Sequence, residues 1–268
     1  MMTSPMKRTK RNRRNSGFSL VEMATVVGII AVLAALSYAA LEVLPQRTRL
    51  TGGALEFSAV ISSARSHAYG RNQRVAVLIN ADGPNLGSPI EYWVVVDSWS
   101  NLPKTLAANK NWKTLNDLTP LAPAPSGSKF TVYDSGHFNP SVRVTEKGFA
   151  DAVGRIVSKG CDAVYDRISL AKGATKGTST FPPPFCFVPN EKACTFCSGA
   201  GVAADPLRGV ILFEPDGTVT FANAEGVASP EGSGSITLRA TGTGGVESAQ
   251  AIVMTNTGLV RTFSANSR

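Results

Sequence analysis

Histidine is scarce in this sequence: only His67 and His137 occur among its 268 residues. Hydrophobic periodicity predicts a helix around His67 and a loop around His137. Neither stands near a Gly-x-Ser-x-Gly motif or a glycine-rich phosphate-binding loop, the local patterns of serine hydrolases and nucleotide-binding enzymes. We therefore expect no catalytic residue, no bound metal and no cofactor, and no enzyme is indicated.

Acidic residues are absent before Glu22, whereas six lysines and arginines fall within residues 7–14. The whole chain has a formal net charge of +8, but residues 18–268 carry 21 basic and 19 acidic residues. The basic character therefore belongs to the N-terminal tail and gives little support to nucleic-acid binding by the rest of the chain. Hydrophobic residues make up 43% of the sequence, which is too many for a disordered protein and fits one or two folded domains.

Charged residues are also absent from Met23 to Leu41, a run of 19 residues. A helix rises about 1.5 Å per residue, so this run spans roughly 28 Å, close to the hydrocarbon core of about 30 Å. Because lysine and arginine crowd its N-terminal side, the positive-inside rule predicts a cytoplasmic N-terminus, with everything after Leu44 across the membrane. A secretory signal peptide cut near Ser37–Ala40 is the alternative, although its apolar region is usually only about 7–15 residues long.

The stretch GFSLVEMATVVGIIAVLAAL, which begins at Gly17, resembles the N-terminal signature of type IV pilin-like proteins. In that family a basic leader ends in glycine, an aromatic phenylalanine follows, and glutamate is the fifth residue of the mature chain. The resemblance implies that a membrane prepilin peptidase cuts between Gly17 and Phe18 on the cytoplasmic face, and that the new amine of Phe18 is methylated. Glycine suits this position because a backbone without a side chain can approach a protease closely.

The resemblance also implies a role in assembly for Glu22. A charged carboxylate at membrane depth costs on the order of 2.5–3.5 kcal/mol, so it usually has a partner. In the family that partner is the N-terminal amine of a neighbouring subunit in the growing filament, which here is the amine of Phe18. The alternative is a carboxylate that simply lies among the lipid headgroups.

A second helical segment is predicted at residues 45–70. Many family members kink the first helix at a proline where this chain has Ala39, so we expect any kink at Pro45 instead. We also expect Gly52 and Gly53 to loosen the joint between the two segments and Gly70 to cap the helix. Apolar residues recur at spacings of 4, 3, 4, 3 and 4, which places them on one core-facing stripe: Leu50, Ala54, Phe57, Ile61, Ala64 and Ala68.

Residues 71–268 are predicted to form a β-rich exported domain, because short β-branched and aromatic runs alternate with turn residues. Two pairs of runs form hairpins, with turns at Glu214–Gly217 (EPDG) and Thr255–Gly258 (TNTG). The fold class is therefore α+β: a long N-terminal transmembrane helix, residues 18–44 after a basic leader at 1–17, continues into a helix packed on a mostly antiparallel, pilin-like β-domain. The strands are expected at residues 73–80, 90–97, 129–135, 141–148, 166–173, 208–222, 235–241 and 250–263.

The order of these elements points to two groups within the pilin-like proteins. A helix that contains SSARSHAYGRNQRVAVLI, a late GVILFEPDGTV and a closing AIVMTNTGLVR are similar to features of the H-type minor pseudopilins of type II secretion and of FimT-like minor pilins. Residues 99–128 and 175–205 have no counterpart in that pattern and are interpreted as insertions.

Cysteine occurs four times, at Cys161, Cys186, Cys194 and Cys197, in an insertion around residues 161–197. All four follow the membrane segment, so an oxidising compartment and their even number favour two disulfides. Three pairings are possible, and Cys161–Cys186 with Cys194–Cys197 closes the shortest loops. The CTFC motif also has the spacing of a zinc-ligand pair, but no second CxxC exists, and no evident helix follows it as a thioredoxin-like site would require.

Three functions fit these features. The favoured one is a minor pseudopilin or minor pilin that joins an inner-membrane filament, of a type II secretion system or a type IV pilus, at initiation or at the tip. It would be a single-pass bacterial inner-membrane protein with a periplasmic domain, and its partners would be prepilin peptidase, other pilins and membrane lipid. The second is a DNA-binding FimT-like pilin of natural transformation, for which residues 65–74, Arg261 and Arg268 are the basic candidates. The third is a membrane-anchored exported protein that prepilin peptidase does not process.

Overall fold

The computed structural model describes residues 19–81, 89–145, 148–149, 185, 192–199, 205–229, 232–241 and 247–265, except for the side chains of residues 35–46, 241 and 247. The chain forms two compact units, Met1–Glu42 and Val43–Arg268. Helix α1, Leu20–Arg71, begins in the first unit and ends in the second. All β-strands that the structure describes belong to the second unit.

Helix α1 ends at Arg71, one residue later than predicted. Asn72 adopts a left-handed conformation with φ of 51°, and the backbone N–H of Gln73 donates to the carbonyl of Ala68 at 3.2 Å. Asparagine tolerates this conformation because its short polar side chain can bond locally. The residue that ends the helix is therefore Asn72, and Gly70 remains inside it.

The glycine pair in α1 also has a different role from the predicted one. The helix continues through Gly52 and Gly53. A Cβ atom on Gly53 would lie 3.0 Å from Cδ1 of Phe138, whereas a Cβ on Gly52 would meet no atom within 4 Å. Gly53 therefore allows the ring of Phe138 to pack closely against the helix.

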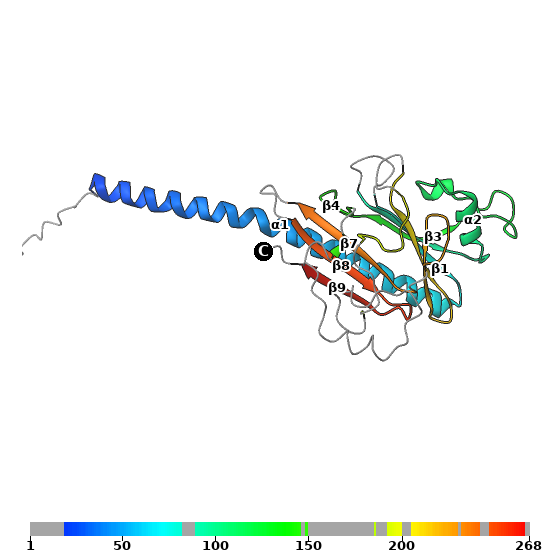
Figure 1. Cartoon of the computed structure of the whole chain (residues 1–268). Helices are drawn as coiled ribbons and strands as arrows, with labels where there is room; N and C mark the ends of the chain where they lie inside the picture. The colour runs from blue at the N-terminus through cyan, green and yellow to red at the C-terminus, as the bar shows by residue number, and fades with distance from the viewer. Residues whose placement is uncertain are drawn as a thin grey trace, which may run out of the picture. The chain divides into compact units, whose positions relative to one another are not determined.

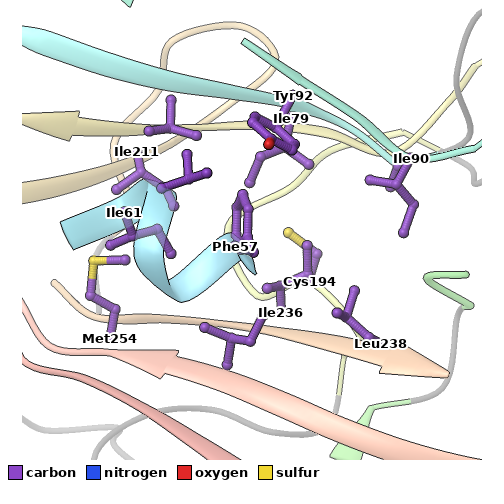
Figure 2. Packing of buried hydrophobic residues seen from close by; sticks show 14 of the residues in the cluster. Phe57, Ile61, Ile79, Ile90, Tyr92, Cys194, Ile211, Ile236, Leu238 and Met254 are labelled. Carbon is purple, nitrogen blue, oxygen red and sulfur yellow. The ribbon is translucent and has the colours of Figure 1, made fainter. Parts of the chain in front are cut away.

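The predicted apolar stripe of α1 is confirmed, since all six of its members are buried. They pack in one core with residues from both sheets of the second unit. Figure 2 shows Phe57 and Ile61 of the helix pointing into this core, with Ile79 and Ile211 on one side and Ile236 on the other. The C-terminal part of α1 thus lies between the two sheets, which explains why its apolar residues follow a period of 3.6.

The first sheet is antiparallel and has the strand order β3-β2-β1-β5-β6. Val77 lies opposite Val94 on one side and Ile211 on the other. Every residue of β1 is buried because Val75, Val77 and Ile79 pack in the core with α1 whereas Ala76 and Leu78 pack in a second cluster. The strands are β1 (Val75–Asn80), β2 (Glu91–Val96), β3 (Thr131–His137), β5 (Arg208–Phe213) and β6 (Val219–Asn223).

The second sheet is also antiparallel, with the order β4-β7-β8-β9 (Figure 1). Its strands are β4 (Val142–Arg143), β7 (Gly234–Thr241), β8 (Glu247–Met254) and β9 (Val260–Ala265). The strand expected at 141–148 is therefore only two residues long, and the one expected at 166–173 lies outside the described residues. His137, predicted to lie in a loop, is the last residue of β3, while His67 lies on α1 as predicted. The other expected strands are confirmed.

The predicted insertion at residues 99–128 covers the outer face of the first sheet. It contains α2 (Leu102–Ala108) and the short 3-10 helix η1 (Leu115–Asp117), and its Leu102, Leu106 and Trp112 pack with Leu78 and Leu212 of the sheet. Strand β5 reinforces this contact through Arg208. The Arg208 guanidinium is buried, donates to the carbonyl of Trp112 at 2.6 Å and lies 5.8 Å from its ring centroid. The insertion is therefore an integral layer of the domain.

The two predicted hairpin turns are confirmed. Each contains a glycine with a positive φ, but only one of these glycines lies against another side chain. Gly217 and Gly258 have φ of 88° and 76°, a conformation that costs other residues about 1–2 kcal/mol. A Cβ on Gly217 would meet nothing within 4 Å, but one on Gly258 would lie 2.6 Å from Nε of Arg65. Arg65 in turn donates to the carbonyls of Gly258 at 3.1 Å and of Thr257 at 2.8 Å.

We expect Gly217→Ala to lower the free energy of unfolding by about 1 kcal/mol, from backbone strain alone. Gly258→Ala should lower it by about 2–3 kcal/mol, because the new methyl group also displaces the charged hydrogen bonds of Arg65. Denaturant unfolding followed by tryptophan fluorescence measures both. Equal losses in the two variants would mean that Arg65 contributes nothing to holding the turn.

Candidate functional site: the N-terminal segment

Helix α1 begins with a side-chain cap. The backbone N–H of Glu22 donates to Oγ of Ser19 at 3.2 Å, and the backbone N–H of Met23 donates to the Ser19 carbonyl at 3.1 Å. Ser19 is therefore the N-cap and Glu22 the third helical residue, where a carboxylate favours the positive end of the helix dipole. The spacing Ser-x-x-Glu is that of a capping box, a pattern by which this cap can be recognised in the sequence alone.

The side chains that follow the cap are apolar and exposed. The Glu22 side chain is also exposed, as is every other described residue from 19 to 34 within the first unit. The large apolar members, each between 47% and 86% exposed, are Leu20, Val21, Met23, Val26, Val27, Ile29, Ile30, Val32 and Leu33. A continuous exposed apolar surface of this kind marks contact with lipid or with another protein.

A membrane span was predicted from this same segment. Among the residues that the structure describes, no helix is both long and apolar enough to cross a membrane. The span at residues 18–44 therefore stays a prediction.

The predicted processing residues lie at the edge of what the structure covers. Gly17 and Phe18 fall outside the described residues, so the structure brings Glu22 together with Ser19 but leaves the scissile bond unplaced. Of the predicted disulfides, Cys194–Cys197 is present, with a Cα–Cα distance of 5.3 Å. Cys161 and Cys186 also lie outside the described residues.

A groove in the second unit, with a volume of about 590 Å³, is lined by one edge of α1 and by β2 and β3. The hydroxyl of Tyr92 donates to a carboxylate oxygen of Glu56 at 3.3 Å within it. Burial, helped by the neighbouring carboxylates of Glu56 and Asp134, raises the pKa of Tyr92 to about 12. Burial also raises the pKa of Glu91, against the opposing effect of His137. Tyr92, like any tyrosine at neutral pH, is protonated and acts here as a hydrogen-bond donor to Glu56.

The basic residues proposed for DNA contact are partly engaged inside the protein. Arg65 holds the carbonyls of the β8–β9 turn. Arg74 donates from Nε to Glu214 at 3.0 Å and pairs with the buried Asp97 at 3.6 Å. Arg71 and Arg261 remain exposed. Within the described ranges, no three His, Cys, Asp or Glu side chains gather as a metal site.

Comparison with known proteins gives one finding. The family model described as the prokaryotic N-terminal methylation motif matches residues 12–38. No curated protein and no solved structure matches the chain.

The matched residues include the predicted cleavage site, Phe18 and Glu22, together with the capped start of α1 and its exposed apolar surface. Such a motif implies processing by a prepilin peptidase and assembly with other pilins, and it is consistent with an anchor in the inner membrane. The N-terminal segment thus carries a prepilin-type methylation motif, which supports a type IV pilin-like protein.

Proposed function

We propose that this protein is a minor pilin or minor pseudopilin, a structural subunit that joins a filament based in the inner membrane. The observation that carries the proposal is the methylation motif at residues 12–38, which coincides with a helix whose large apolar side chains are exposed. Apolar surface of this extent is costly in water, so it is stable only against lipid or against similar helices. Both environments are available to a pilin, in the membrane before assembly and in the filament after it.

The insertion at residues 99–128 supports a position of this subunit at the tip of the filament or in the initiating complex. The insertion at residues 99–128 adds a packed layer to the outer face of the first sheet and makes the domain bulkier. A subunit at the end of a filament has fewer lateral neighbours than one inside it, so it accommodates added bulk more easily. This argument applies equally to the pseudopilus of a type II secretion system and to a type IV pilus.

DNA binding is the weaker alternative. It requires lysine and arginine side chains that are free to meet phosphates. Arg65 and Arg74 are instead committed to the β8–β9 turn and to Glu214 and Asp97. Arg268 lies outside the described residues, and the exposed Arg71 and Arg261 by themselves do not make a basic stripe.

Processing by a prepilin peptidase is the test of the proposal. The mature chain should begin at a methylated Phe18, because the peptide bond after Gly17 stands in the family's cleavage context. Co-expression with a prepilin peptidase, followed by intact-mass and N-terminal peptide mass spectrometry, measures the new terminus. Gly17→Leu should abolish the cut, since a side chain beside the scissile bond blocks the protease.

The control variant is Ala40→Leu, which alters the cut site of the signal-peptide alternative and should leave processing at Phe18 unchanged. A chain that keeps Met1, or a terminus near Ala40 that is lost in Ala40→Leu, would contradict the proposed function.

A further inference from the structure

The segment at residues 192–199, which we call the clasp, pairs with both sheets. On the side of β7, the backbone N–H of Thr237 donates to the carbonyl of Ala193 at 2.6 Å, and that of Thr195 donates to Ser235 at 3.1 Å. On the side of β5, Ser198 and Arg208 exchange both backbone hydrogen bonds, at 3.0 and 2.9 Å. Because β7 and β5 belong to different sheets, the clasp is a main-chain bridge between them.

The middle of the clasp inserts an aromatic ring between the sheets. Phe196 is buried, and its ring centroid lies 5.3 Å from that of Phe221 on β6. A Cβ atom on Gly209 of β5 or on Gly234 of β7 would lie 2.8 Å from atoms of this ring. Both glycines therefore leave the space that Phe196 occupies, one on each sheet.

The disulfide closes the clasp between its two attachment points. Cys194 pairs with Ile236 of β7 and is only 3% exposed, and Cys197 directly precedes Ser198, which pairs with β5. Figure 2 shows Cys194 in the core beside Ile236 and Phe57. The bond between Cys194 and Cys197 thus fixes the distance between the part of the chain on one sheet and the part on the other.

We propose that the clasp is a redox-controlled lock, which joins the two sheets when Cys194 and Cys197 are oxidised and releases them from each other at this end when the cysteines are reduced. In the dithiol form, no covalent bond holds residues 194–197 in their bent conformation. The hydrogen bonds of the clasp to β7 and β5 therefore open more easily. Opening withdraws Phe196 from between Gly209 and Gly234. Through the lock, the packing between the two sheets depends on whether the compartment around the domain is oxidising or reducing.

The chemistry of locking is a thiol–disulfide exchange. Two S–H bonds break and one S–S bond forms, and two electrons with two protons pass to a partner disulfide, which becomes a dithiol. The oxidant is a disulfide of an oxidoreductase or of oxidised glutathione. Only the source of this oxidant rests on the proposed export, because the cytoplasm keeps thiols reduced whereas extracytoplasmic compartments do not.

Hydrogen–deuterium exchange of the full chain in detergent tests the lock directly. Peptides that cover residues 192–199, 205–213 and 233–239 report the two attachment points, and peptides of β1 and β2 report the rest of the first sheet. Two double variants are compared with the native protein: Cys194→Ala/Cys197→Ala, and Cys161→Ala/Cys186→Ala as the matched control. The second variant is also reduced and then reoxidised, so the test does not depend on the folding of the first.

Loss of the Cys194–Cys197 bond should speed exchange at both attachment points by roughly twentyfold, the factor that loop-closure entropy gives for four residues. Exchange in β1 and β2 should not change, the control variant should match the native protein, and reoxidation should restore protection. Unchanged exchange at either attachment point, or a uniform increase across the domain, would overturn the lock. Because the readout uses purified protein, it is independent of whether Phe18 becomes the mature terminus.

Discussion

Glu22→Gln should abolish filament assembly while leaving membrane insertion and cleavage intact. Glutamine can still serve at the third position of a capping box with Ser19, so the start of α1 is preserved. It cannot pair with the charged amine of Phe18 in a neighbouring subunit. Removing one member of a desolvated charge pair costs about 3–5 kcal/mol, so association with partner subunits should weaken by roughly a hundredfold or more.

Comparison of three substitutions separates the two roles that Glu22 can have. Glu22→Val removes both the charge and the polar side chain that a capping box places at this position, and it should fail in assembly as Glu22→Gln does. Glu22→Asp keeps the charge on a shorter arm and should be intermediate. Site-specific cross-linking to partner pilins measures assembly, while membrane fractionation and mass spectrometry confirm insertion and cleavage. Normal cross-linking in Glu22→Gln with a defect only in Glu22→Val would assign Glu22 to capping and end the pairing hypothesis.

The parts of the fold that depend on local patterns could be predicted from the sequence. The spacing of Leu50, Phe57 and Ile61 identifies a helix face because 3.6-residue periodicity is a property of the segment itself. The turns at Glu214–Gly217 and Thr255–Gly258 are recognisable because glycine supplies the positive φ that they require. The end of α1 was misplaced because Gly70 and Asn72 are both acceptable there, and local propensity does not choose between them.

The parts that depend on contacts distant in sequence could not be predicted. Nothing near Phe196 in the chain indicates that Gly209 and Gly234 leave space for its ring. The sequence identifies residues 99–128 only as an insertion, whereas in the structure Trp112 is buried and donates from its indole N–H to the carbonyl of Ala224 at 3.0 Å. In the candidate site, Glu22 is identifiable by its charge beside an apolar run. The cap by Ser19 is a weaker signal, because Ser-x-x-Glu is a common spacing and only the structure shows the hydrogen bond that it makes.

The largest stability effect in the second unit is expected from Phe57→Ala. Phe57 is fully buried between the two sheets, and its ring lies 5.9 Å from that of Tyr92 and 5.5 Å from that of Phe138. Its removal leaves a cavity that the surrounding strands cannot fill without breaking their register. Substitutions of this kind lower the free energy of unfolding by about 3–5 kcal/mol.

Leu55→Ala is the matched control, because Leu55 lies two residues away on the same helix and is 59% exposed. It removes an apolar side chain of the helix without opening a core cavity, so its effect should stay within about 0.5 kcal/mol. The three tryptophans, Trp93, Trp99 and Trp112, all lie in the second unit, so their fluorescence during denaturant unfolding of the full chain in detergent reports this unit alone. Similar losses in the two variants would contradict the packing of α1 against the two sheets, because in that packing Phe57 lies on the buried face of the helix and Leu55 on its exposed face.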